Sequence, residues 1–146
     1  MFMDASEIKL SLKTVGNRTM VWDPVRKKWC LFTPEEHVRQ SLIYYLSTKL
    51  AYPLSYMAVE KRVSGLTPAI RFDLLIYNPQ HQPWMLVECK KPEVTLTEDT
   101  LFQLLRYQKS LQCPYWVLSN GHELMCAQAF LDGKIHWLDD LPPYGR

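Results

Sequence analysis

Two short apolar runs with charged residues at their ends constrain the fold of this chain more than any other feature. Residues 70–77 and 84–88 are rich in Ile, Leu, Val and aromatic side chains, and turn-forming residues separate them. This pattern predicts a β-hairpin. Both faces of each run are apolar, so we expect central strands of a sheet that is covered on both sides. Charged side chains are costly in such strands and need a compensating partner.

The expected register of the hairpin places two carboxylates side by side. If the six-residue connection sets Tyr77 opposite Trp84, then Asp73 lies directly opposite Glu88 on the same face. Like charges in this arrangement destabilise a sheet. The pair therefore predicts a cation nearby.

Two kinds of cation meet this requirement. Lys90 follows Glu88 by two residues, so the alternation of a strand returns its side chain to the face of both acids. A divalent ion is the alternative. Asp73, Glu88 and the backbone carbonyl of Cys89 would offer oxygen ligands to Mg²⁺, with waters completing the shell.

A helix is predicted earlier in the chain. Thr33 has the character of an N-cap, Pro34 suits the first helical position, and Glu36 completes a capping box. The helix is expected to extend to about Leu50. Its apolar stripe steps back to Glu35, which is therefore expected on the core side, with Glu36 at the edge of the stripe. Both acids are equally compatible with a simple preference for the positive end of the helix.

Further strands and one more helix are expected from periodicity and turn residues. The strands are expected at residues 8–15, 20–23, 28–32, 54–63, 114–119, 123–130 and 134–138. The second helix follows the N-cap Thr97. We expect a single domain over residues 1–146, with residues 1–20 as an N-terminal strand extension and residues 139–146 as a frayed tail.

Composition and motif content narrow the possible functions. The chain is 47% hydrophobic and 22% charged, and its net charge of +2 does not by itself indicate a polyanion partner, although a local basic face stays open. Four cysteines are too widely spaced for a zinc site. No signal peptide or membrane span is found, so a cytoplasmic protein is expected. Neither a Gly-x-Ser-x-Gly motif nor a Gly-rich phosphate loop occurs, so the hydrolase classes that these motifs mark have little support from the sequence.

The charged hairpin residues resemble a known active-site motif. Asp73, fourteen intervening residues and then Glu88, Cys89 and Lys90 resemble the motif of the PD-(D/E)XK nuclease superfamily. This chain has Phe72 where the name of the family has proline.

Two further segments resemble one branch of that superfamily. Residues 33–40 resemble the opening helix of the N-terminal nuclease domain of type I restriction-enzyme R subunits. Gln103 followed by Tyr107 resembles the glutamine–tyrosine signature of the same branch. The resemblance covers about residues 22–128 and implies an α/β fold with a restriction-endonuclease-like core, in which a central mixed sheet is flanked by helices.

The resemblance also implies roles for particular residues. Asp73 and Glu88 would hold Mg²⁺ or Mn²⁺, and Lys90 would orient or activate water. Glu35, with Glu36 as the second choice, would bind a second ion or its waters. Gln103 would support the metal or the scissile phosphate.

The substrate implied by the resemblance is DNA, with translocase or restriction-complex subunits as possible partners. Arg71, Lys91 and Tyr107 are the expected contacts to the nucleic acid. The sequence does not distinguish DNA from RNA or endonuclease from exonuclease action, and it leaves the oligomeric state open.

Two alternatives to a nuclease stay open. One is a non-catalytic module that keeps a nuclease-like fold for binding nucleic acid or docking a partner. The other is a structural domain in which Lys90 neutralises Asp73 and Glu88 as a buried ion network.

Overall fold

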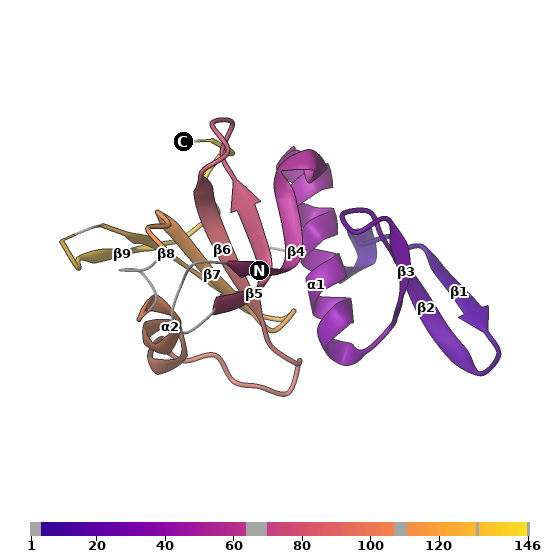
Figure 1. Cartoon of the computed structure of the whole chain (residues 1–146). Coiled ribbons are helices and arrows are strands. Elements are labelled where there is room, and N and C mark those ends of the chain that lie inside the picture. Colours follow the sequence, from indigo (N-terminus) through magenta and orange to yellow (C-terminus); the bar gives the residue numbers. More distant parts are fainter. Residues whose placement is uncertain (1–3, 64–69, 107–110, 131, 146) are drawn as a thin grey trace.

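The computed structural model describes residues 4–63, 70–106, 111–130 and 132–145, of which residues 61–63, 70 and 71 are described by their backbone alone. The chain forms a three-stranded sheet and a six-stranded sheet, and helix α1 lies between them (Figure 1). None of the helices in this described part of the chain has the length and apolar character that a membrane span requires.

The small sheet is built from residues 12–31. It contains β1 (Leu12–Val15), β2 (Arg18–Asp23) and β3 (Lys28–Leu31), which pair antiparallel in that order. The hairpin expected at residues 20–32 is confirmed. The strand expected from residue 8 begins only at Leu12, and residues 8–11 are irregular. A short 3₁₀ helix at Ala5–Glu7 precedes them, and the Asp4 side chain caps this helix by accepting a hydrogen bond from the N–H of Ser6.

Helix α1 (Pro34–Tyr44) begins as the sequence predicts. The Thr33 hydroxyl accepts a hydrogen bond from the N–H of Glu36 at 3.0 Å, and Pro34 occupies the first turn. A π-helical turn, Tyr45–Lys49, continues the helix to within one residue of the expected end. Almost every side chain from residue 36 to residue 43 is buried, because α1 is covered by both sheets.

The six-stranded sheet is mixed, as expected. Its strands are β4 (Met57–Val63), β5 (Ile70–Tyr77), β6 (Pro83–Cys89), β7 (Tyr115–Ser119), β8 (Leu124–Ala129) and β9 (Ile135–Leu138), in that order across the sheet. Of the strand pairs that the structure describes, β6 and β7 alone are parallel. A parallel pair needs a long crossover, and helix α2 (Glu98–Leu105) lies within it, capped by the Thr97 hydroxyl. The chain is therefore an α/β protein.

The core has one apolar cluster on each face of the large sheet. Leu74 and Val87 pack in the cluster that contains Leu42 of α1. Leu75 and Leu86 pack in the cluster that contains Leu101 of α2. The apolar character of both strand faces, read from the sequence, thus reflects two helices on opposite sides.

The central hairpin keeps most of its expected register but not all of it. Leu74 pairs with Val87 and Ile76 pairs with Met85, as expected. Tyr77, however, pairs with Pro83 and not with Trp84, because a bulge separates Ile76 from Tyr77. The Asn78 side chain accepts hydrogen bonds from the N–H groups of Gln80 and Gln82 and organises this turn, which is one residue shorter than expected.

The C-terminal segment is packed against the large sheet, so the expectation of a frayed tail is wrong. The Tyr144 hydroxyl donates to the carbonyl of Tyr77 at 2.7 Å, and its ring contacts Trp84 with centroids 5.3 Å apart. The buried hydroxyl of Tyr52 donates to the carbonyl of Pro142. Tyr144 and the buried Pro142 therefore cover the end of the sheet that carries the β5–β6 turn.

Candidate active site

Two carboxylates lie together where β5 and β6 meet. Leu74 pairs with Val87; Asp73 directly precedes Leu74 on β5, and Glu88 directly follows Val87 on β6. The Asp73 Oδ2 atom accepts a hydrogen bond from the N–H of Cys89 at 2.7 Å. Burial and then the charge of Asp73 raise the pKa of Glu88 to about 7, against the lowering effect of Lys90.

Lys90 stands next to the acid pair. Its Nζ atom is 3.7 Å from Oε1 of Glu88, and both side chains are partly exposed. The N–H of Lys90 donates to the carbonyl of Ser119 at 2.8 Å, so the chain after β6 stays attached to β7. This attachment places the lysine at the edge of the site.

A pocket of about 260 Å³ joins the lysine and one of the acids to helix α2. Its walls include Glu88 and Lys90 from the end of β6 and Gln103 from α2. Phe72, Thr100, Leu104 and Arg106 complete the lining. Three residues expected in the site from their sequence pattern therefore surround one hollow, with the carboxylate of Asp73 beside it.

A buried arginine contacts the acid pair from the opposite side. Arg39 of α1 is 4% exposed, and its Nη2 atom is 3.4 Å from Oδ1 of Asp73. Its Nη1 atom is 3.0 Å from Oε1 of Glu36 and 3.4 Å from Oε1 of Glu60. Arg39 was not among the residues predicted for the site. The available signal was its spacing of three from Glu36, which is typical of an ion pair on a helix.

The same ion network continues into the small sheet. Arg26, in the β2–β3 turn, binds the fully buried Asp23 and places Nη2 2.6 Å from Oε1 of Glu36. Glu36 thus lies between Arg26 and Arg39. Charged contacts run without interruption from the small sheet through α1 to Asp73.

The two helix glutamates differ from expectation in their burial. Glu36 is 7% exposed and is bound by Arg26, Arg39 and Gln40, so its carboxylate does not complete the capping box. Glu35 is the more exposed of the two, and its charge contributes to the raised pKa of Glu88. The expectation that Glu35 points to the core and Glu36 to its edge is therefore wrong, because both sides of α1 are covered.

A second hollow of about 710 Å³ lies next to the acids. Its walls include Glu35, Arg39, Glu60 and Lys91, and residues of β3 close it. Glu60 falls between the paired residues Val59 and Lys61 and adopts a φ of 52°, a strained value for a non-glycine residue within a strand. Its contact with Arg39 brings it into the site, although a strand glutamate is more often simply solvated.

The acid pair fits a hard divalent cation by its charge. Among the described residues no group of three or more His, Cys, Asp or Glu side chains is gathered to hold a metal ion. The site would therefore rest on Asp73 and Glu88, with waters completing the shell. Burial raises the pKa of the Cys89 thiol well above its usual value, so this side chain stays protonated and only its backbone carbonyl is a candidate ligand.

The structure leaves parts of the expected nucleic-acid contact open. Tyr107 lies outside the described residues, and the side chain of Arg71 does too, although its backbone is part of β5. Lys91 is exposed and lines the larger hollow, separate from the pocket that holds Lys90.

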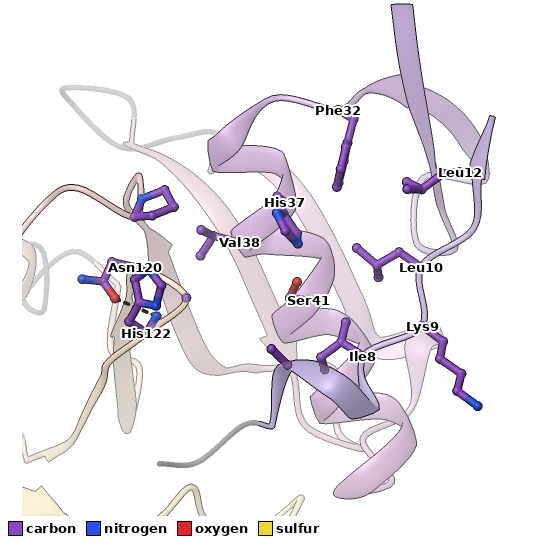
Figure 2. A pocket seen from close by; sticks show the side chains of 13 residues that line it. Ile8, Lys9, Leu10, Leu12, Phe32, His37, Val38, Ser41, Asn120 and His122 are labelled. Carbon is purple, nitrogen blue, oxygen red and sulfur yellow. Dashed lines mark hydrogen bonds between the residues drawn. The ribbon is translucent and has the colours of Figure 1, made fainter. Parts of the chain in front are cut away.

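A third pocket, of about 700 Å³, has no acidic residue in its lining. Figure 2 shows it between the N-terminal segment, α1 and the β7–β8 turn, with Leu10, His37 and His122 among its labelled side chains. The turn approaches α1 so closely that a Cβ atom on Gly121 would lie 3.3 Å from Cγ2 of Val38. None of the residues expected in the active site lines this pocket.

The fold and the site together define an α/β protein whose central strands carry an acid pair and a lysine beside a helix glutamine. The family described as type I restriction enzyme R protein N terminus (HSDR_N) matches residues 34–142, and the chain belongs to this family. This match confirms the resemblance to the N-terminal domain of type I restriction-enzyme R subunits, and it indicates a role related to restriction enzymes. A comparison with curated proteins finds no match.

Proposed function

We propose that this chain is a metal-dependent nuclease domain that hydrolyses the phosphodiester backbone of DNA. The observation that carries the proposal is the grouping of Glu88, Lys90 and Gln103 around one pocket, with Asp73 adjacent. Membership of a restriction-enzyme family supports DNA as the substrate. Other subunits of a restriction complex, including a translocase, are the partners that we propose on the same basis.

Asp73 and Glu88 are the proposed ligands of Mg²⁺ or Mn²⁺, with the backbone carbonyl of Cys89 completing the protein's set. A bound ion would neutralise charge on the phosphate and lower the pKa of a bound water. Glu35 is the proposed helix ligand for a second ion, because the carboxylate of Glu36 is already held by two arginines. Arg39 would keep Asp73 in place until the ion binds.

Lys90 and Gln103 have positioning roles in this proposal. The Lys90 ammonium, beside Glu88, would attract the phosphate and orient the attacking water. The Gln103 amide, across the same pocket, would donate to a phosphate oxygen. Arg71, Lys91 and Tyr107 stay proposed contacts to the rest of the DNA strand.

A non-catalytic module is the second candidate, and the ion pair between Arg39 and Asp73 favours it. In such a module the guanidinium of Arg39 would supply the positive charge that the acid pair needs, in place of a divalent ion. The two candidates differ in whether the acid pair binds a divalent ion.

Thermal unfolding with and without Mg²⁺ separates them. An Mg²⁺ concentration ten times the Kd would add about 1.4 kcal/mol of stability. For a chain of this size this is a rise of about 3–6 °C in Tm. We expect this rise in the wild type and in Asp132→Ala, which changes an exposed acid of a surface turn, but not in Asp73→Ala. A wild-type Tm that Mg²⁺ and Mn²⁺ leave unchanged would support the non-catalytic module.

A further inference from the structure

The outer face of the small sheet carries two tryptophans that are only partly buried. Val21 and Asp23 of β2 are fully buried, so the alternation of the strand turns Trp22 to the opposite face. Trp22 is paired with Trp29 of β3, and their ring centroids are 5.5 Å apart at an angle of 64°. Two large aromatic rings thus lie on a sheet face that points away from the buried residues.

The same sheet concentrates the positive charge of the protein. Residues 12–31 contain five cations and one acid, a net charge of +4, whereas the whole chain has a net charge of +2. The cations are Lys13, Arg18, Arg26, Lys27 and Lys28. The acid, Asp23, is fully buried and paired with Arg26, and the other four cations are exposed. The accessible charge of this sheet is therefore entirely positive, which is complementary to a polyanion.

Lys13 links the charge to the aromatic rings. Its Nζ atom lies 4.3 Å from the centroid of a Trp29 ring. A nucleic-acid base that stacked on this ring would replace the ammonium group, which would then be free to pair with the neighbouring phosphate. The sheet thus offers a stacking surface and a phosphate partner within one contact.

The sheet is continuous with the candidate active site. Among the described strands β3 is an edge strand that pairs with β2, and its residues Lys28, Trp29 and Leu31 line the hollow of about 710 Å³. Glu35 and Lys91 line the same hollow. A strand of nucleic acid on the sheet can therefore pass along β3 toward the acid pair.

We propose that the outer face of the small sheet binds single-stranded DNA. This inference rests on the proposed function and extends it to the form of the substrate. Bases would stack on Trp22 and Trp29, and phosphates would pair with Lys13 and Arg18, which the strand register places on the same face as the two rings. Stacking on aromatic side chains together with a basic surface is the usual mode of binding for unpaired strands, whereas the bases of a duplex are not free to stack in this way.

The test is the binding of a fluorescein-labelled oligonucleotide of fifteen thymidines to the whole chain, followed by anisotropy in EDTA. We expect Trp22→Ala with Trp29→Ala to weaken binding about tenfold or more. Phenylalanine at both positions should restore most of the affinity, because it keeps an aromatic face. Lys13→Ala and Arg18→Ala should each lower the slope of log K against log salt by about 0.7.

The control variant is Trp137→Ala, which removes a tryptophan that is 42% exposed on β9. It should bind as the wild type does. The tryptophan pair should change binding of a matched duplex by less than about threefold. The proposal is wrong if the double alanine variant binds the oligonucleotide as well as the wild type does, if the duplex loses affinity equally, or if the phenylalanine pair fails to restore binding.

Failure of this proposal is distinct from failure of the nuclease proposal. Binding that needs both tryptophans in a protein that cuts no DNA would keep the sheet proposal and reject the nuclease. Metal-dependent cutting by a protein whose oligonucleotide binding does not depend on the tryptophans would keep the nuclease proposal and reject the sheet proposal.

Discussion

At the scale of single residues, the site depends on the ionisation of Glu88. Its side chain is faced by Asp73 and Lys90 and is within the influence of Glu35. Burial and the charge of Asp73 raise its pKa to about 7. The protein without a metal ion therefore holds a proton that the unfolded chain releases at a lower pH.

This ionisation predicts a pH-dependent stability in EDTA. The unfolded carboxyl has a pKa of 4.5, so between about pH 4.5 and 7 the folded state binds more protons at Glu88 than the unfolded state. The stabilisation that the proton provides is lost as the pH rises through about 7. Glu88→Gln stays neutral, so its Tm should fall less than that of the wild type between pH 5 and pH 8. Equal falls in Tm for both proteins would contradict the raised pKa.

Sequence pattern predicted the paired acids and Lys90, because alternation in a strand depends only on local geometry. Arg39 was not predicted, and Glu36 was assigned to the wrong environment. Their burial arises from the small sheet, whose residue Arg26 contacts Glu36 ten positions away. A helical periodicity shows which positions share a face, but it does not show that a second sheet covers the polar face.

At the scale of elements, α1 connects the two sheets through charged contacts as well as apolar ones. Glu36 pairs with Arg26 of the small sheet, and Arg39 pairs with Asp73 of the large one. The Nε atom of Arg39 is buried, and no residue in the described part of the chain forms a hydrogen bond with it. Burying the guanidinium of an arginine in this way costs free energy, and the carboxylates around it offset that cost.

Removing that arginine should destabilise the protein strongly. Arg39→Ala leaves Glu36 with less compensation and removes a partner of Asp73, and breaking a buried ion pair costs about 3–5 kcal/mol. Urea unfolding measures the loss. The control is Lys49→Ala, which breaks an exposed pair with Glu7 and should cost less than about 1 kcal/mol. A loss below about 1 kcal/mol for Arg39→Ala would show that the network contributes no stability.

The helix starts and most strand positions were predicted, since caps, turns and alternation are local signals. The register at Tyr77 and the packing of the C-terminal segment were not. The first depends on the hydrogen bonds that the Asn78 side chain makes within the turn. The second depends on rings that meet only in the folded chain, such as Tyr144 against Tyr52 and Trp84.

At the scale of the whole molecule, charge is divided between two surfaces. The small sheet presents accessible cations, and the centre of the large sheet presents an acid pair with one adjacent lysine. α1 lies between these surfaces (Figure 1). The arrangement places a basic surface on one side of α1 and, on the other, a group of residues suited to hold a divalent ion.

The most direct test of the nuclease proposal is cleavage of supercoiled plasmid and of single-stranded DNA by the purified chain in Mg²⁺, Mn²⁺ or EDTA. We predict cutting that requires a divalent ion, is lost in Asp73→Ala, and falls by about a hundredfold or more in Lys90→Ala. Lys134→Ala, which alters a lysine on an exposed turn, should cut as the wild type does. A wild type that folds but cuts neither substrate with either ion, or that cuts equally well in both site variants, would contradict the proposal.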